Sequence, residues 1–245
     1  GNVLLPKIEL IDAKEKHRKK EMKGHFSDRL LKLIQEALNE KEQVILFQNR
    51  RGFSPVVECT TCGVSPQCPN CDVSLTYHKF KHELRCHYCN YQRAMPNNCD
   101  ACGSNTLDHK GFGTEQIELE LRALFPDHTI GRMDLDTTRG KHGYQKIIGA
   151  FEAREIDVLV GTQMLSKGLD FDNVSLVGII NADSMLNFPD FRAHERAYQM
   201  MVQVSGRAGR NKKQGNVAIQ TFNPYHQILQ QVAATNYTEM YNEQL

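Results

Sequence analysis

The stretch DVLVGTQMLSKGLDFDNVSLVGII, residues 157–180, decides the fold class of this chain. Both of its ends, residues 157–160 and 174–180, are almost entirely apolar, with Asp157 and Ser175 as the exceptions. Runs of this kind are typical of strands in a parallel sheet that helices cover on both faces. We therefore expect an α/β protein. We also expect the loop after Val160 to lie where parallel sheets gather ligands, beyond the carboxyl ends of the strands.

Strand and helix patterns alternate on both sides of this stretch. Ser27 stands where an N-cap is expected, because apolar residues recur at helical spacing after it, up to Leu38. The other expected strands are residues 7–11, 44–47, 129–133 and 217–221, and the other expected helices are residues 114–125, 144–151, 192–204 and a last helix from 226. Repeated strand–helix–strand units predict a parallel sheet with helices on both faces.

The eight cysteines fall into four Cys-x-x-Cys pairs, which we call hooks. In chain order the hooks are Cys59/Cys62, Cys68/Cys71, Cys86/Cys89 and Cys99/Cys102. Each hook places two thiolates within reach of one tetrahedral ion, and two hooks complete a closed zinc site. A redox dithiol would use a single hook near the start of a βαβ unit, and a chain without an export leader is not expected to hold disulfides. The hooks therefore predict two structural Zn²⁺ ions.

Four hooks can pair in sequential, crossed or nested order. A strand-like run at residues 73–77, between the second and third hooks, suits the hairpin of a zinc ribbon, and the outer two hooks would then close the base of the insert. This nested arrangement puts Cys59, Cys62, Cys99 and Cys102 on one ion and Cys68, Cys71, Cys86 and Cys89 on the other. Eight thiols fill both sites, so His78, His82 and His87 are expected to be ordinary surface residues.

Charge does not mark the chain as a strong polyanion binder, because its formal net charge is +1 at pH 7. The charged side chains of the cysteine-rich segment nearly cancel, and four thiolates outweigh each Zn²⁺. Attraction for phosphate is therefore not the main purpose of this segment. Stapling a segment too small to fold alone is the simplest purpose, with docking of protein partners or of a DNA end as a functional addition. The basic residues 13–23 suit a solvated linker as well as a DNA contact.

The segment QVSGRAGR, residues 203–210, carries the strongest functional pattern. Gln203, Arg207 and Arg210 fall at i, i+4 and i+7, so a helix would present them on one face. Gly206 leaves room for an anion, and the planar, permanently charged guanidinium is suited to a phosphoryl group. An arginine finger is worth roughly 10³–10⁵ in rate, and we favour Arg210 in that role. The alternative is a helix end with two surface arginines, but Gln-x-x-Gly-Arg-x-Gly-Arg is the pattern of motif VI in superfamily 2 helicases.

The segment GTQMLSKGLD, residues 161–170, resembles helicase motif V. A hydroxyl at a strand end, with free backbone N–H groups at the following helix start, makes a seat for phosphate. The resemblance implies that Thr162 and Gln163 face the DNA backbone. It also implies that Gly168 and Asp170 face nucleotide or the opposing lobe.

Two further positions are candidate DNA contacts. Arg50 and Arg51 follow the strand expected at 44–47, in a position like that of motif IV, although a basic loop tip is the plain alternative. Thr114 caps the helix expected at 114–125, whose N-terminus could seat another DNA phosphate.

Two parts of an ATP-driven motor are missing from the sequence. No Gly-x-x-x-x-Gly-Lys-[Ser/Thr] loop occurs, since Gly140-Lys141 lacks the upstream glycine and the hydroxyl residue, and no Asp-Glu-x-His box occurs. The loop that cradles ATP and the carboxylates that hold Mg²⁺ must then belong to another lobe. Alone, the chain is expected neither to hydrolyse ATP nor to translocate.

The chain begins Gly1-Asn2 rather than with Met, which suggests an excised part of a longer protein.

Together these residues resemble the C-terminal helicase lobe of the PriA family, the bacterial primosomal helicases that restart stalled replication. Besides the four hooks, the shared stretches are FQNRRGF at 47–53, GTEQ at 113–116, GTQM at 161–164 and PDFRA at 189–193. The resemblance implies a RecA-like lobe of an ATP- and Mg²⁺-dependent 3′-to-5′ DNA helicase that acts on forks, D-loops and single strands. It also implies contacts with the protein's own N-terminal helicase lobe, with single-strand DNA-binding protein and with primosome-loading proteins.

The expected organisation has four parts. Residues 1–58 begin the RecA-like lobe, 59–102 form the zinc-binding insert, 103–225 complete the lobe with motifs V and VI, and 226–245 form a helix leading to a further domain. The apolar stretches are too short to span a bilayer and no export leader opens the chain, which indicates a cytoplasmic, nucleoid-associated protein with no membrane contact. Two alternatives stay open: a zinc-stapled interaction module without motor activity, and an RNA helicase lobe.

Overall fold

The computed structural model describes most of the chain. The described residues are 6–48, 57–71, 74–78, 81–86, 89–108, 114–134, 137–138, 140–161, 171–183 and 214–242, the side chains of the last helix being described up to 234. The helix predicted at 192–204 lies outside these ranges.

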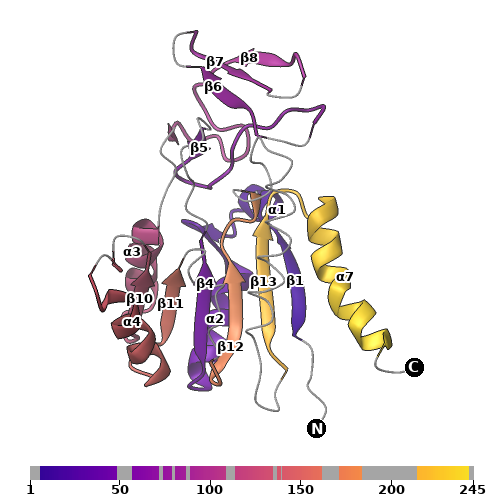
Figure 1. The fold of residues 1–245 in the computed structure, drawn as a ribbon. Helices are drawn as coiled ribbons and strands as arrows, with labels where there is room; N and C mark the ends of the chain where they lie inside the picture. Colours follow the sequence, from indigo (N-terminus) through magenta and orange to yellow (C-terminus); the bar gives the residue numbers. More distant parts are fainter. Residues whose placement is uncertain are drawn as a thin grey trace.

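A six-stranded sheet, parallel throughout its described pairings, forms the centre of the molecule (Figure 1). Its strands are β1 (Lys7–Asp12), β4 (Gln43–Phe47), β10 (Ile130–Met133), β11 (Val158–Gly161), β12 (Val174–Ile179) and β13 (Asn216–Thr221). They lie in the order β1-β13-β12-β4-β11-β10. The four central strands are almost wholly buried, as the continuous apolar runs predict.

Helices cover both faces of this sheet, and successive residues of each strand point to opposite faces. The helices are α2 (Asp28–Asn39), α3 (Thr114–Leu124), α4 (Gly143–Glu152) and α7 (Gln227–Asn242). In β4, Val44 and Leu46 pack in one apolar cluster with α2 and α3. Ile45 and Phe47 pack in a second cluster with α4 and α7. The α/β prediction is therefore confirmed, with one hydrophobic core on each face.

In the N-terminal part of the lobe, the predicted cap of α2 is confirmed, and a helix and a hairpin that were not predicted precede it. Ser27 caps α2, and its hydroxyl accepts a hydrogen bond from the Leu30 backbone N–H at 3.1 Å. The charged segment before it, expected to be a linker or a DNA contact, folds into helix α1 (Ala13–Arg18) and a small hairpin of β2 (Met22–Lys23) and β3 (Phe26–Ser27). Lys16 pairs with Asp28 at 2.8 Å, so part of its positive charge is neutralised locally.

The cysteine-rich insert follows β4, precedes α3 and lies beyond the carboxyl ends of the parallel strands (Figure 1). At its base β5 (Glu58–Cys59) pairs antiparallel with β9 (Leu107–Asp108), a pairing that extends past the predicted limit of 102. Farther from the lobe, β6 (Thr76–His78), β7 (Glu83–Arg85) and β8 (Gln92–Ala94) form an antiparallel sheet. The hairpin predicted between the second and third hooks is β6–β7.

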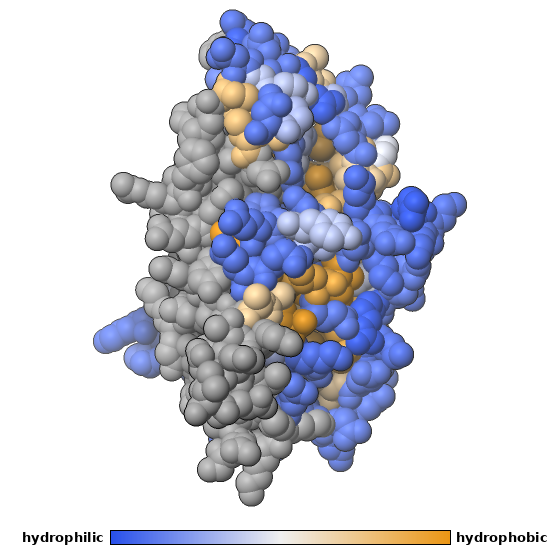
Figure 2. Space-filling model, turned by 90° about the vertical axis from the view of Figure 1, so that its right-hand side faces the viewer, coloured by the Kyte–Doolittle hydropathy of each residue, from blue (hydrophilic) through white to orange (hydrophobic). Residues whose placement is uncertain are grey.

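None of the described helices combines the length and the apolar character that a crossing of the bilayer requires. Figure 2 shows the side of the molecule on which α7 and β1 lie in Figure 1. The coloured part of this face is largely hydrophilic, with apolar side chains showing between polar ones.

Candidate metal centres and helicase edge

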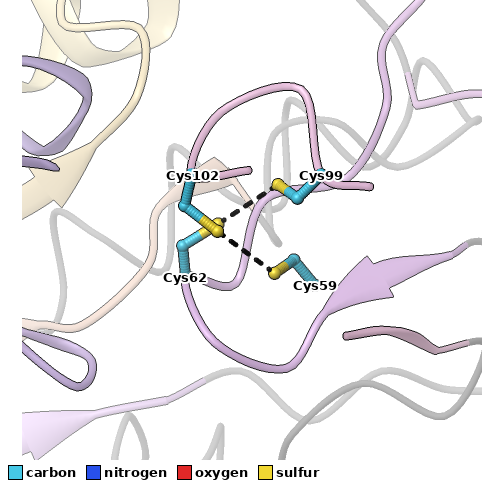
Figure 3. Close-up of side chains that lie close together, drawn as sticks. All are labelled: Cys59, Cys62, Cys99 and Cys102. Atoms are coloured by element: carbon cyan, nitrogen blue, oxygen red, sulfur yellow. Dashed lines mark hydrogen bonds between the residues drawn. The ribbon is translucent and has the colours of Figure 1, made fainter. Parts of the chain in front are cut away.

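The first and fourth hooks form one four-cysteine group, which we call the inner site (Figure 3). The Sγ atoms of Cys59 and Cys102 are 3.7 Å apart, and those of Cys62 and Cys99 are 3.6 Å apart. A tetrahedral zinc ion with Zn–S bonds of about 2.3 Å would set its sulfur atoms roughly 3.8 Å apart. A disulfide would need about 2 Å, and all eight cysteines are free thiols in the structure. The inner site therefore fits one four-thiolate zinc ion.

The two hooks of the inner site have the same local geometry. Each ends in a glycine with positive φ, 77° at Gly63 and 76° at Gly103. The backbone N–H of each glycine donates to the carbonyl oxygen of the first cysteine of its hook, Cys59 or Cys99, at 2.8 Å. A left-handed residue is needed to close so tight a turn, and glycine adopts that conformation without steric cost. Each hook thus turns its two sulfur atoms to the same side (Figure 3).

Hydrogen bonds around Cys59 favour its thiolate form. Thiol donors from Cys62 and Cys99, followed by the hydroxyls of Ser104 and Thr106, lower the pKa of Cys59 below its usual range. The two hydroxyl oxygens lie 3.2 and 3.4 Å from the Cys59 sulfur. The hydrogen bonds with Cys59 raise the pKa of Cys62 and Cys99 in turn, so these thiols share protons within one closely packed group.

The second and third hooks form the outer site, next to the three-stranded sheet of the insert. The Sγ atoms of Cys68 and Cys89 are 3.5 Å apart. Backbone N–H groups of Asn70 and Tyr91 each donate to one of these sulfur atoms at 3.4 Å. The Tyr91 bond is the main reason that the pKa of Cys89 is lowered to about 7. Donors that point at the sulfur atoms also fit a thiolate zinc site.

The nested pairing of hooks is therefore confirmed, and the two cysteine groups fit two zinc sites. No histidine belongs to either group among the described residues. The ring of His82 lies instead 3.2 Å from the Tyr77 hydroxyl, and His78 is exposed at the end of β6. His87 lies outside the described residues.

The carboxyl edge of the sheet holds polar groups that sequence reasoning missed. Asp183, just past β12, is buried and accepts hydrogen bonds from the Thr221 hydroxyl at 2.9 Å and the Phe222 backbone N–H at 2.8 Å. Burial raises the pKa of Asp183 to about 6. His25 and Asn181 lie at the same edge and contact the insert. No spacing motif marked these residues, because their partners are far away in the sequence.

Thr114 is the first residue of α3, rather than a residue before it, and is 3% exposed. Its hydroxyl donates to the carboxylate of Asp134, at the end of β10. The side chain is therefore held by the lobe itself, and the DNA contact proposed for the start of this helix stays a prediction.

The remaining predicted site residues lie outside the described residues. They are Arg50, Arg51, Thr162, Gln163, Gly168, Asp170, Gln203, Gly206, Arg207 and Arg210. The described strands bracket them: residues 162–170 follow β11 directly, and residues 184–213 lie between the end of β12 and β13. Both segments therefore leave or approach a parallel sheet whose carboxyl edge is the usual place for a ligand.

Two protein-family models match the chain. Residues 112–212 match the helicase conserved C-terminal domain, and residues 68–93 match the Cys-rich region domain of PriA DNA helicase. The second match contains all four cysteines of the outer site and none of the inner site. These matches and the described fold define a helicase C-terminal domain that carries a PriA-type cysteine-rich region.

Relatives match almost the whole chain. Replication restart protein PriA of Bacillus subtilis is 42% identical over 242 residues, which cover 99% of this chain and 30% of the relative. Replication restart protein PriA of Synechocystis is 44% identical over 237 residues, which cover 95% of this chain and 28% of the relative. The chain belongs to the PriA family and spans about 30% of the length of these relatives.

A solved structure of Mss116p DEAD-box helicase domain 2 bound to an RNA duplex is a more distant match. It has 14% sequence identity and a TM-score of 0.46, over 94% of this chain and 59% of that one.

Proposed function

We propose that this chain is the second motor lobe of an ATP-dependent 3′-to-5′ DNA helicase that initiates replication restart at stalled forks and D-loops. The observation that carries this proposal is the similarity to PriA along 99% of the chain, across the helicase domain and the insert together. The parallel sheet supports it, because two predicted motifs adjoin the strands β11, β12 and β13.

In this proposal the motif VI arginines act on the nucleotide. Arg207 and Arg210 reach across a cleft to the γ-phosphate of ATP, and Arg210 stabilises the charge that develops during transfer. Gln203 and Gly206 line the same cleft, together with Gly168 and Asp170. The cradle for ATP and the ligands of Mg²⁺ come from the N-terminal helicase lobe, so this chain alone is inactive.

The DNA-facing surface in this proposal is formed by Thr162, Gln163, Arg50 and Arg51, together with the N-terminus of α3 at Thr114. Backbone N–H groups at a helix start and arginine side chains are suited to DNA phosphates. Contacts of this kind position DNA without reading its sequence, as a helicase that acts on fork structure requires.

The insert, which we take as residues 59–102, serves in this proposal as a zinc-stapled platform. Its eight cysteines would hold two Zn²⁺ ions, which supply folding energy to a segment with little apolar core. We infer that single-strand DNA-binding protein and primosome-loading proteins dock on the assembled helicase. We also place the protein at the bacterial nucleoid, and residues 226–245 lead to a further domain.

The test is Arg207→Ala and Arg210→Ala, each in a full-length PriA protein. DNA-stimulated ATP hydrolysis should fall by roughly 10³-fold or more for at least one of them, because the charge on the transferred phosphoryl group loses its partner. Arg122→Ala is the matched control, since Arg122 is an exposed arginine of the same lobe, with a side chain 57% exposed. Its ATPase activity should stay at the wild-type level.

Two results would support other functions. Unchanged ATP hydrolysis in both motif VI variants would indicate a zinc-stapled interaction module without motor activity. Unwinding of an RNA duplex in preference to forked DNA would indicate an RNA helicase lobe.

A further inference from the structure

Three elements of the lobe hold the first hook of the insert. His25, in the turn between β2 and β3, has its Nε2 atom 2.8 Å from the carbonyl oxygen of Thr60. Asn181, just after β12, donates from its amide to the carbonyl oxygen of Gly63. Phe222, just after β13, packs against the inner cysteines. We propose that this contact is a coupling joint with His25 as its positioning residue, so that the insert moves together with the sheet edge.

Both nitrogen atoms of the His25 ring have hydrogen-bond partners in other segments. The side chain is 4% exposed, and its Nδ1 atom faces Glu120, a residue of α3, while Nε2 faces Thr60. Each ring nitrogen therefore has an oxygen atom of another segment as its hydrogen-bond partner, one on α3 and one on the first hook. Hydrogen bonds are directional, and they weaken steeply when the donor and acceptor are misaligned. These hydrogen bonds restrict the angle between the first hook and the lobe. Apolar packing alone would allow a wider range of angles.

The turn that carries His25 is shaped to receive Glu120. One carboxylate oxygen of Glu120 accepts from the His25 backbone N–H at 2.8 Å, while the other faces the ring. Gly24 has φ +57°, and a Cβ atom at this position would collide with the Glu120 carboxylate. Glycine therefore serves both the left-handed backbone and the approach of the carboxylate.

Gln220 ties this turn to the two strands that bracket the segment 184–213, which carries predicted motif VI. Its side-chain amide donates to the carbonyl oxygen of His25 at 2.8 Å and to that of Ile180 at 2.9 Å. Gln220 belongs to β13, and Ile180 follows β12. His25 and Gln220 therefore link two parts of the molecule by hydrogen bonds. One part is the first hook of the insert, and the other is the pair of strands, β12 and β13, between which the segment 184–213 lies in the sequence.

Apart from Phe222, which packs against the inner cysteines, the joint adds no apolar residue to the clusters of the lobe or to the cysteine clusters of the insert. The lobe has an apolar cluster on each face of the sheet, and the insert has its own two cysteine sites. The joint therefore sets the orientation of one body relative to the other. Provided that the proposed motor function holds, a displacement of the ends of β12 and β13 during ATP turnover is transmitted to the insert.

A spin-label distance measurement tests the joint without any enzyme activity. Labels carried on unnatural amino acids, which spare the cysteines, replace Gln35 on α2 and Gln92 on β8, both exposed. The wild-type chain should give a narrow distance distribution, and His25→Ala and Gly24→Ala should each broaden it while both zinc ions are retained. His128→Ala is the matched control, because it breaks another histidine–carboxylate pair, with Asp157 at 3.6 Å. An unchanged distribution in both joint variants overturns the proposal.

Coupling is then measured in the full-length helicase. His25→Ala should keep the kcat of DNA-stimulated ATP hydrolysis within about twofold and lower unwinding of a forked duplex about 10-fold, so more ATP is used per base pair opened. Should this variant fold poorly, Glu120→Gln keeps the shape of the pair and removes only its charge. Equal loss of ATP hydrolysis and unwinding, or no loss of unwinding, overturns the coupling role. A wild-type protein without DNA-dependent ATPase would contradict the motor function instead, and the spin-label result would still decide the joint.

Discussion

The RecA-like lobe and the cysteine-rich insert are stabilised by different means. In the lobe, large apolar side chains such as Phe26, Phe47 and Phe151 are fully buried. In the insert, the cluster at the inner site has cysteines as its only buried members among the described residues. The cluster at the outer site adds just Val57, Leu75 and Leu84 to its two buried cysteines. A segment of this size cannot bury enough apolar surface, so we expect its stability to depend on bound metal.

Metal removal should have the largest effect, because we expect it to unfold the insert and to leave the lobe folded. A chelator should unfold the insert, because structural zinc supplies on the order of 10–16 kcal/mol to small zinc domains. Hydrogen exchange should show lost protection in β6, β7 and β8 and retained protection in β4, β11 and β12. Zinc should leave in two phases, the outer site first, since two of its cysteines, Cys71 and Cys89, are half-buried, whereas the inner site has one half-buried cysteine, Cys102.

Loss of protection in the lobe strands together with the insert would contradict this division. It would mean that the lobe also depends on zinc. Release of both ions in a single phase would contradict the expected order of the two sites.

A cavity in the lobe should have a smaller effect, and it should destabilise the lobe while the insert keeps its zinc. Leu46→Ala, in the central strand β4, removes a side chain that is 0% exposed, and should lower the free energy of unfolding of the lobe by about 2–5 kcal/mol. Denaturant titration followed by far-UV circular dichroism measures this loss, and zinc content should stay at two ions per chain. Leu119→Ala is the matched control, because Leu119 is 57% exposed and its removal should change stability by less than about 0.5 kcal/mol. Zinc loss in Leu46→Ala would contradict independent stabilisation.

The smallest effect is expected for an ion pair on the surface of the insert. Arg93 donates to Asp100 at 2.6 Å, and the two side chains are 32% and 60% exposed. Because solvent screens exposed pairs, Arg93→Ala should cost less than about 1 kcal/mol and leave the rate of zinc release almost unchanged. Zinc release timed with a colorimetric chelator, in parallel with wild type, measures this. A release rate raised more than about 10-fold would mean that surface charge, and not only the thiolates, holds the insert together.

Local patterns were enough for most of the lobe and for the metal sites. The continuous apolar runs placed β11 and β12 because a strand buried on both faces has no polar side. Ser27 marked the start of α2 because its hydroxyl bonds a backbone N–H only three residues away. The nested hooks followed from one strand-like run between the second and third hooks. In contrast, the roles of Arg207 and Arg210 stay predictions, since both lie outside the described residues.

The pattern of charges along the sequence did not predict the structure of segments whose charged side chains pair with distant residues. The basic segment at 13–23 gave no sign of α1 or of the β2–β3 hairpin, whose fold depends on partners outside the segment. His25 was passed over as one histidine among many. Its partner Glu120 lies 95 residues away, and no periodicity records a contact of that separation.

By itself the sequence determined most strands and helices of the described part of the lobe and which cysteines can share an ion, because short-range spacing governs both. Only the tertiary structure decided that β1 lies beside β13, at the opposite end of the chain, and that the first hook seats on His25, Asn181 and Phe222. These choices depend on shape and on hydrogen bonds between distant segments. Such contacts come into existence only once the chain has folded, so the order of residues along the chain does not reveal them.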